Sequence, residues 1–192
     1  MKIIFFDTET TGLDPKVNGI HQLAGEIIID DEEVEKFDYR IKPFKGSKID
    51  PQALEVSNTK AIDFRKYDRE SQIYFMLYEM FGKYQDYQDK KDKFFLAGWR
   101  APEFDFKFLQ AFYARNSQEN TFNSSFWSNP IDVKVLATQY LMHQRPVMES
   151  FSLVSVAKYL GIEVDDSKLH SAAYDACLSR KIYEKVTGNQ KC

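Results

Sequence analysis

The sequence has few cysteines and no excess of basic residues. Its two cysteines, Cys177 and Cys192, cannot form a disulfide framework. Cys177 lies in an apolar helical stretch and is expected to be a small core residue, and Cys192 is expected to be free. The reducing interior of a cell, taken as the cytoplasm, is therefore the expected location. The formal net charge of -3 argues against a protein that wraps long duplex through many phosphate contacts.

Long apolar runs are also missing. No stretch approaches the ~20 apolar residues that would span a membrane, and no signal peptide is visible before the first expected strand. The 192 residues are 43% hydrophobic and 29% charged, which is typical of a globular chain with its own core. We expect one domain over residues 1–187 and a C-terminal tail over 188–192.

Apolar periodicity predicts strands that come early and helices that follow. The aromatic content is 15%, enough for a core and for some stacking on bases. The expected strands are 2–6, 22–29 and 34–41, joined by a hairpin at 30–33, then 94–99 and a short strand from 131. The expected helices are 69–87, one whose first turn holds Pro102, 133–142, 151–160 and 172–186. Residues 42–68 show no regular pattern. Residues 86–93 are expected to form a solvated loop, and residues 115–129 are expected to form a further loop. The order favours an α/β fold, a mixed sheet flanked by helices.

Two acids lie at the end of the first expected strand. Asp7 and Glu9 are two residues apart, so strand alternation places both on one face, about 7 Å apart along the strand. Carboxylate oxygens suit hard cations such as Mg²⁺ and Mn²⁺, and a pair of ions about 3.5–4 Å apart could share Asp7. Taken alone, this pattern is more often two solvated acids before a turn.

Two further acids and a histidine occur later in the chain. Asp105 falls near the start of an expected helix, where the helix dipole favours a negative charge. Asp175 lies on the face of the last helix that carries Leu178 and Ile182, so it needs a cation or hydrogen-bond partners. His170 is expected in the loop before that helix, where it could accept a proton from water near neutral pH.

These residues together resemble the DEDDh (DnaQ-like) family of 3′–5′ exonucleases, which has an RNase H-like fold. The first motif, residues 7–12, reads Asp-Thr-Glu-Thr-Thr-Gly and matches fully. Phe104-Asp105 followed by Phe108-Leu109 matches the core of the second motif. His170 and Asp175 have the H-x-A-x-x-D spacing of the third. The three motifs cover nearly the whole chain in the family's order.

The resemblance implies a five-stranded mixed sheet whose second strand is antiparallel to the rest. It also implies that Asp7, Glu9, Asp105 and Asp175 are ligands of two Mg²⁺ or Mn²⁺ ions and that His170 is the general base. All five residues are therefore candidate catalytic residues.

Substrate contacts are predicted at four positions. The resemblance implies that Thr10 and Leu13 meet the terminal nucleotide, and the Phe108 ring is a candidate for the same role. The family often has His-Asn where this chain has Arg100 and Ala101. Arg100 could hold a phosphate or pair with a nearby acid, and the sequence favours neither.

The expected activity is metal-dependent 3′–5′ hydrolysis of terminal phosphodiesters in single-stranded nucleic acid, which releases nucleoside 5′-monophosphates. DNA is slightly favoured, and an exoribonuclease that trims RNA ends or oligoribonucleotides is the alternative. A non-catalytic binding module or polymerase-associated subunit, and an RNase H-like endonuclease, remain as rivals. The expected partners are 3′ ends of single-stranded DNA or RNA, and no replication or repair partner can be identified from the sequence.

Overall fold

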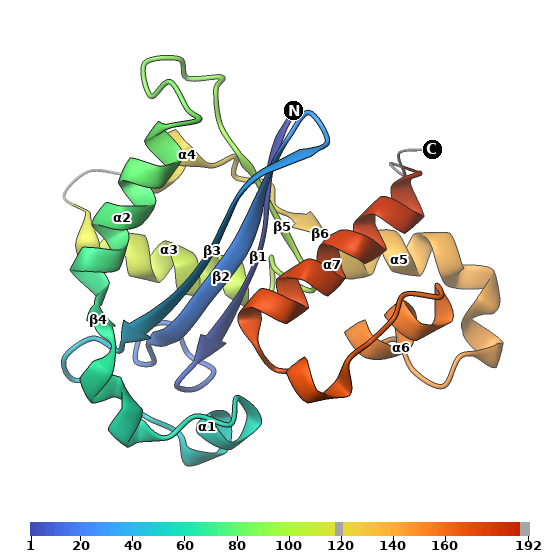
Figure 1. The fold of residues 1–192 in the computed structure, drawn as a ribbon, viewed down its shortest axis with the longest axis horizontal. Coiled ribbons are helices and arrows are strands. Elements are labelled where there is room, and N and C mark those ends of the chain that lie inside the picture. The colour runs from blue at the N-terminus through green and yellow to red at the C-terminus, as the bar shows by residue number, and fades with distance from the viewer. Residues whose placement is uncertain (118–120, 189–192) are drawn as a thin grey trace.

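The structure is a computed structural model that describes residues 1–117 and 121–188 (Figure 1). The tail expected at 188–192 lies outside this part of the chain apart from Gly188, and so does Cys192. In chain order the elements are β1 (Lys2–Thr10), β2 (Ile20–Ile29), β3 (Glu32–Lys42), α1 (Pro51–Val56), the 3-10 helix η1 (Ala61–Lys66), β4 (Asp68–Arg69), α2 (Glu70–Gly82), β5 (Phe95–Gly98), α3 (Asp105–Asn116), α4 (Thr121–Ser125), β6 (Ile131–Asp132), α5 (Val133–Leu141), η2 (Met142–Val147), α6 (Leu153–Tyr159), η3 (Asp166–Lys168) and α7 (Ala172–Thr187).

Within the described residues the strands form one sheet in the order β4-β3-β2-β1-β5-β6. β2 is antiparallel to both of its neighbours, and the other paired strands are parallel, so the predicted mixed sheet is confirmed. The sheet has six strands instead of the expected five. The extra strand, β4, is two residues long, which is too short to show an alternating pattern in the sequence.

The hairpin between β2 and β3 is tighter than expected, because β3 already begins at Glu32. Asp30 and Asp31 both have positive φ, +49° and +66°, as a two-residue type I′ turn requires. Such a turn matches the twist of the two strands and fixes their register, which pairs Ile29 with Glu32.

Alternation along β1 separates two apolar cores. Ile4 and Phe6 are buried in the core under α2 and α3. Ile3 and Phe5 are buried in the second core, under α5, α6 and α7. Figure 1 shows these two groups of helices on opposite sides of the sheet. Because side chains alternate along a strand, the residues that follow at 7 and 9 face α7, and residue 8 faces α3.

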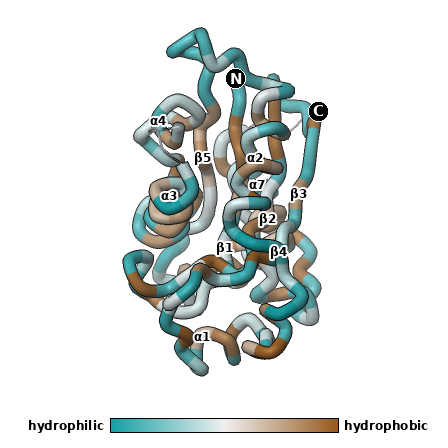
Figure 2. The backbone as a smooth tube through the Cα atoms, turned by 90° about the vertical axis from the view of Figure 1, so that its left-hand side faces the viewer, coloured by the Kyte–Doolittle hydropathy of each residue, from teal (hydrophilic) through white to brown (hydrophobic). Residues whose placement is uncertain are grey.

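Several expected boundaries were wrong. Short helices α1, η1 and α4 occupy segments that were expected to be irregular or loop, because one or two helical turns carry little periodicity. α2 ends at Gly82 instead of 87, and Tyr87 folds back so that its ring stacks on Tyr78 with centroids 4.9 Å apart. Pro102 lies in the turn before α3, whose first residue is Asp105. Figure 2 shows the expected charged loop between α2 and β5 as a hydrophilic projection.

Two expectations from composition can be compared with the structure. Cys177 is only partly buried and lines a surface groove, so its prediction as a core residue was wrong. Among the described helices, none is both long enough and apolar enough to cross a membrane.

Candidate active site

The site forms where β1 and β5 diverge. These strands pair in parallel only from Ile3–Phe95 to Phe5–Ala97. A Cβ at Gly98 would lie 2.7 Å from the carbonyl oxygen of Phe6, so the backbones still approach closely one residue beyond the last paired position. In the strand order, β1 is followed by β2 toward one edge of the sheet and β5 is followed by β6 toward the other. Such a switch point opens a crevice beyond the carboxyl ends of parallel strands.

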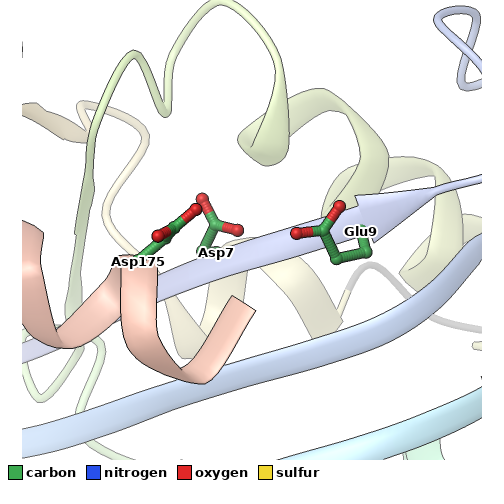
Figure 3. Close-up of side chains that lie close together, drawn as sticks. All are labelled: Asp7, Glu9 and Asp175. Carbon is green, nitrogen blue, oxygen red and sulfur yellow. The ribbon is translucent and has the colours of Figure 1, made fainter. Parts of the chain in front are cut away.

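Three carboxylates meet in this crevice. Asp7, Glu9 and Asp175 each offer an oxygen, and these oxygens lie within 4.8 Å of one another. Figure 3 shows Asp7 and Glu9 projecting from one face of β1 toward the first turn of α7, which carries Asp175. Ala172 and Ala176 on α7 are fully buried. Their small side chains let the helix approach the sheet closely enough to bring Asp175 to β1.

Asp105 reaches β1 from the α3 side. It is the first residue of α3 and is 5% exposed. Its Oδ1 accepts hydrogen bonds from the backbone N–H of Thr8 at 3.1 Å and from the Thr8 hydroxyl at 2.5 Å. Because β5 has diverged at this level, this N–H is free to bind the carboxylate. Asp105 is therefore tethered beside the other three acids, although it lies outside the group whose oxygens are within 4.8 Å.

The clustering makes these acids hard to ionise. Burial raises the pKa of Asp7 well above its usual value, and the charges of Asp105, Glu9 and Asp175 raise it further. Burial raises the pKa of Glu9 to about 8, with contributions from Asp175 and Asp105 that Arg40 partly opposes. Burial raises the pKa of Asp105 to about 6 despite the hydrogen bonds from Thr8. Burial also raises the pKa of Asp175 to about 6.

The donor set fits hard divalent cations. Asp175 Oδ1 is buried and has no hydrogen-bond partner among the described residues, a costly state for an ionised carboxylate without a counter-charge. All the ligand atoms in the cluster are carboxylate oxygens, the donors that Mg²⁺ and Mn²⁺ prefer. The acidic cluster could therefore hold metal, which would relieve the repulsion among its members.

His170 stands in the loop before α7, as its spacing from Asp175 predicted. It has a positive φ of +60°, and its side chain is exposed. Its backbone and its imidazole lie close enough to Asp175 to oppose part of the rise in the pKa of that carboxyl. Together with Asp7 and Asp175 it lines a cavity of about 500 Å³. The imidazole is thus held at the mouth of the acidic cluster while remaining open to solvent.

Apart from Arg100, the remaining walls of this cavity come from residues that the sequence analysis did not single out. Trp99 and Lys134 line one part, and residues 151–154 line another. A second groove of about 760 Å³ shares Leu169 and His170 with the cavity. Lining residues of this kind leave no signal in a single sequence, since each is an ordinary surface side chain until the fold brings it to the crevice.

The four candidate substrate contacts differ in their exposure. Leu13 is 81% exposed at the turn after β1. The Thr10 side chain is buried, and its hydroxyl donates to the carbonyl of Gly12 at 2.7 Å, so it shapes that turn. Phe108 is 1% exposed and packs on Phe104, so its ring is closed to a substrate in this structure, contrary to the expectation.

Arg100 lines the cavity and pairs with Glu103 at 2.8 Å. Of the two uses that the sequence left open, the structure thus shows the contact with a nearby acid. The neighbouring Ala101 is fully buried in the α3-side core and faces no solvent.

The fold and the acidic crevice are those of a nuclease. The model of the exonuclease family RNase_T matches residues 4–183, and the chain belongs to this family. It is accordingly a hydrolase that acts on phosphodiester bonds, with an RNase H-like fold.

One relative by sequence is ribonuclease T of Buchnera aphidicola subsp. Baizongia pistaciae (strain Bp). It is 25% identical over 196 residues, which cover 98% of this chain and 84% of that protein.

Solved structures of exonuclease I have a similar fold. One matches with a TM-score of 0.76 at 19% identity, over 99% of this chain and 41% of that chain. The zinc-bound complex of Escherichia coli exonuclease I with single-stranded DNA matches with a TM-score of 0.74 at 19% identity, over 99% of this chain and 41% of that chain. The complex of the E. coli enzyme with a dT13 oligonucleotide gives 0.72 at 19% identity, over 98% and 42%. This chain therefore spans about two fifths of the exonuclease I chains that it matches.

Proposed function

We propose that this protein is a 3′–5′ exonuclease that removes nucleoside 5′-monophosphates from the end of a single strand with the help of two Mg²⁺ or Mn²⁺ ions. The observation that supports this most directly is the convergence of Asp7, Glu9 and Asp175, with Asp105 tethered beside them. These residues come from the two ends and the middle of the chain. Their meeting at an open crevice matches the ligand set of a metal-dependent nuclease.

Each polar group then has a distinct task. Asp7, Glu9 and Asp175 hold the ions on the α7 side of β1, and Asp105 completes the set from the α3 side. The ions, when bound, supply positive charge that lowers the cost of forming hydroxide and of charging the leaving 3′ oxygen. His170 accepts the proton of the attacking water, which its exposed imidazole can pass on to solvent. Leu13, exposed at the turn after β1, packs against the terminal base.

The substrate is a single-stranded 3′ end, and we slightly favour DNA. The structures of exonuclease I in complex with DNA oligonucleotides support this choice through the similarity of the fold. An exoribonuclease is the second candidate, because the similarity to a ribonuclease T runs along 98% of this chain.

End-labelled digestion tests the proposal. Matched single strands of DNA and RNA, labelled at the 5′ end, should give a descending ladder that requires Mg²⁺ or Mn²⁺. A 3′ label should be released at once as a mononucleotide. Asp7→Ala should abolish turnover while part of the single-strand binding survives. A binding module of the same fold would give no ladder with either metal. An endonuclease would cut a circular single strand, which the proposed enzyme must leave intact.

A further inference from the structure

A cationic pocket lies next to the turn that follows the acidic cluster. Residues 40–48, from the last residues of β3 into the loop before α1, contain four basic residues and no acidic residue, in a chain whose net charge is -3. Lys42, Phe44 and Lys45 from this segment line a pocket of about 460 Å³, together with Arg69, Glu70 and Asn116. Three basic side chains are thus concentrated in one pocket at one edge of the molecule.

The three basic side chains of this pocket do not stabilise the fold through polar contacts. The side chains of Lys42, Lys45 and Arg69 are exposed and take part in no hydrogen bond or ion pair among the described residues. The acid in the pocket, Glu70, is 7% exposed and is already paired with Arg115 at 2.8 Å. The lining is therefore net positive, and its positive groups are free to meet an external anion.

Buried contacts build this pocket and join it to the active-site turn. The guanidinium of Arg115 stacks on the Phe44 ring at 4.3 Å while it pairs with Glu70. Its Nη1 also donates to the carbonyl of Pro15 at 3.4 Å, in the turn between β1 and β2 that carries Leu13. One side chain thus fixes the pocket floor against the turn beside the acidic cluster.

The pocket and the acidic cluster also open at the same edge of the sheet. β1, β3 and β4 run in the same direction, so their carboxyl ends lie together, as the lower edge of the sheet in Figure 1 shows. β3 is two strands from β1, a separation of roughly 10 Å at ordinary strand spacing. The acidic cluster lies on the α7 side of the sheet and the pocket is lined from α2 and α3 on the other side, so a strand held at the end of β1 would pass around this edge to reach Lys42 at the end of β3.

We propose that Lys42, Lys45 and Arg69 bind the phosphate backbone of the substrate strand on the 5′ side of the end held at the acidic cluster. This inference rests on the proposed exonuclease function. Lysine is a flexible point charge that contacts phosphates without reading sequence, which suits an enzyme that must release and rebind its substrate after each cut. An acidic protein segment is the alternative occupant. The position of the pocket on the active-site edge favours nucleic acid.

The test compares a triple variant, Lys42→Gln/Lys45→Gln/Arg69→Gln, with a matched control, Lys90→Gln/Lys91→Gln/Lys185→Gln. The control residues are also exposed, but they lie in the loop before β5 and near the end of α7, at the opposite edge of the sheet. Steady-state kinetics are measured on a trinucleotide and on a strand of about 20 nucleotides. A trinucleotide has only two phosphodiesters, so with its 3′ end at the acidic cluster it should end before the pocket.

On the long strand, the triple variant should raise KM with little change in kcat. Single-strand affinity varies with salt to a power of about -0.7 for each phosphate contact, which makes each cation worth about fivefold in KM at 0.1 M salt. Three contacts give about a hundredfold, and the slope of log KM against log salt should fall by about 2. The KM of the triple variant for the trinucleotide should equal that of the wild type. The KM of the control variant should equal that of the wild type for both substrates. A conservative Lys42→Arg/Lys45→Arg variant should keep the wild-type KM.

Three results would overturn the inference. The first is an equal rise in KM for the trinucleotide, which would mean that the substitutions act through the fold. The second is a slope of log KM against log salt that is the same in the triple variant and the wild type, which would indicate that the pocket binds an acidic protein segment instead. The third is an affinity of the wild type that does not fall when the upstream phosphates are replaced by uncharged methylphosphonates. If the wild type cleaves neither substrate, the proposed function itself fails, so the two ideas are separable.

Discussion

Asp175→Asn should make the metal-free protein more stable while it removes nuclease activity. The structure raises the pKa of Asp175 from 3.8 to about 6, so the folded protein resists ionisation of this carboxyl more than the unfolded chain does. This difference corresponds to on the order of 3 kcal/mol at a pH above both values. Asparagine has nearly the same shape and carries no charge.

The sign of the pH dependence follows from the raised pKa. An acid with a raised pKa holds more protons in the folded state, so the wild-type protein without metal loses stability as the pH rises above about 4 and through about 6. Glu9, with a pKa raised to about 8, extends this loss toward higher pH. The gain from Asp175→Asn should therefore be absent near pH 3.5 and fully developed at pH 8.

Thermal denaturation in EDTA at several pH values measures this effect. For a chain of this size, 1 kcal/mol shifts the midpoint by about 2–4 °C, so the variant should melt roughly 6–12 °C above the wild type at pH 8. Added Mn²⁺ should raise the wild-type midpoint and have a much smaller effect on the variant. Glu79→Gln, which removes an exposed charge on α2, should change stability by no more than about 0.5 kcal/mol. A variant at Asp175 that is no more stable than the wild type at pH 8 without metal would refute the reasoning.

Substitutions at three further positions test other predictions for the site. His170→Asn, which tolerates the positive φ, should lower kcat by about 10²–10⁴-fold with little change in midpoint, and a normal kcat would exclude His170 as the general base. Thr8→Val removes the hydroxyl that holds Asp105 and should cost about 1.5–3 kcal/mol; Thr8→Ser should keep both stability and kcat, and equal loss in the two variants would argue against the tether. Phe108→Ala should cost about 3–5 kcal/mol because the ring is core, and chemical denaturation measures this. A stable Phe108→Ala protein with a raised KM would instead favour the predicted substrate contact.

The sequence by itself determined the features that depend on near neighbours. The spacing of Asp7 and Glu9 places both on one face of a strand, because alternation is a local property of extended backbone. The spacing of five positions from His170 to Asp175 placed the histidine in a loop, because a helix would have turned it away from the acid. Apolar runs likewise located five of the strands and most of the long helices, with errors of a few residues at their ends.

Only the tertiary structure decided which distant residues meet. Nothing near Thr8 in the sequence shows that it tethers Asp105, 97 positions away, because that contact requires β5 to leave the edge of β1. The burial of Phe108 and the pairing of Arg100 with Glu103 depend on how α3 and the turn before it lie on the sheet. The free cations at Lys42 and Arg69 come together only because β3 and β4 end side by side. Local pattern is set by bonded neighbours, but a site is set by the packing of the whole chain.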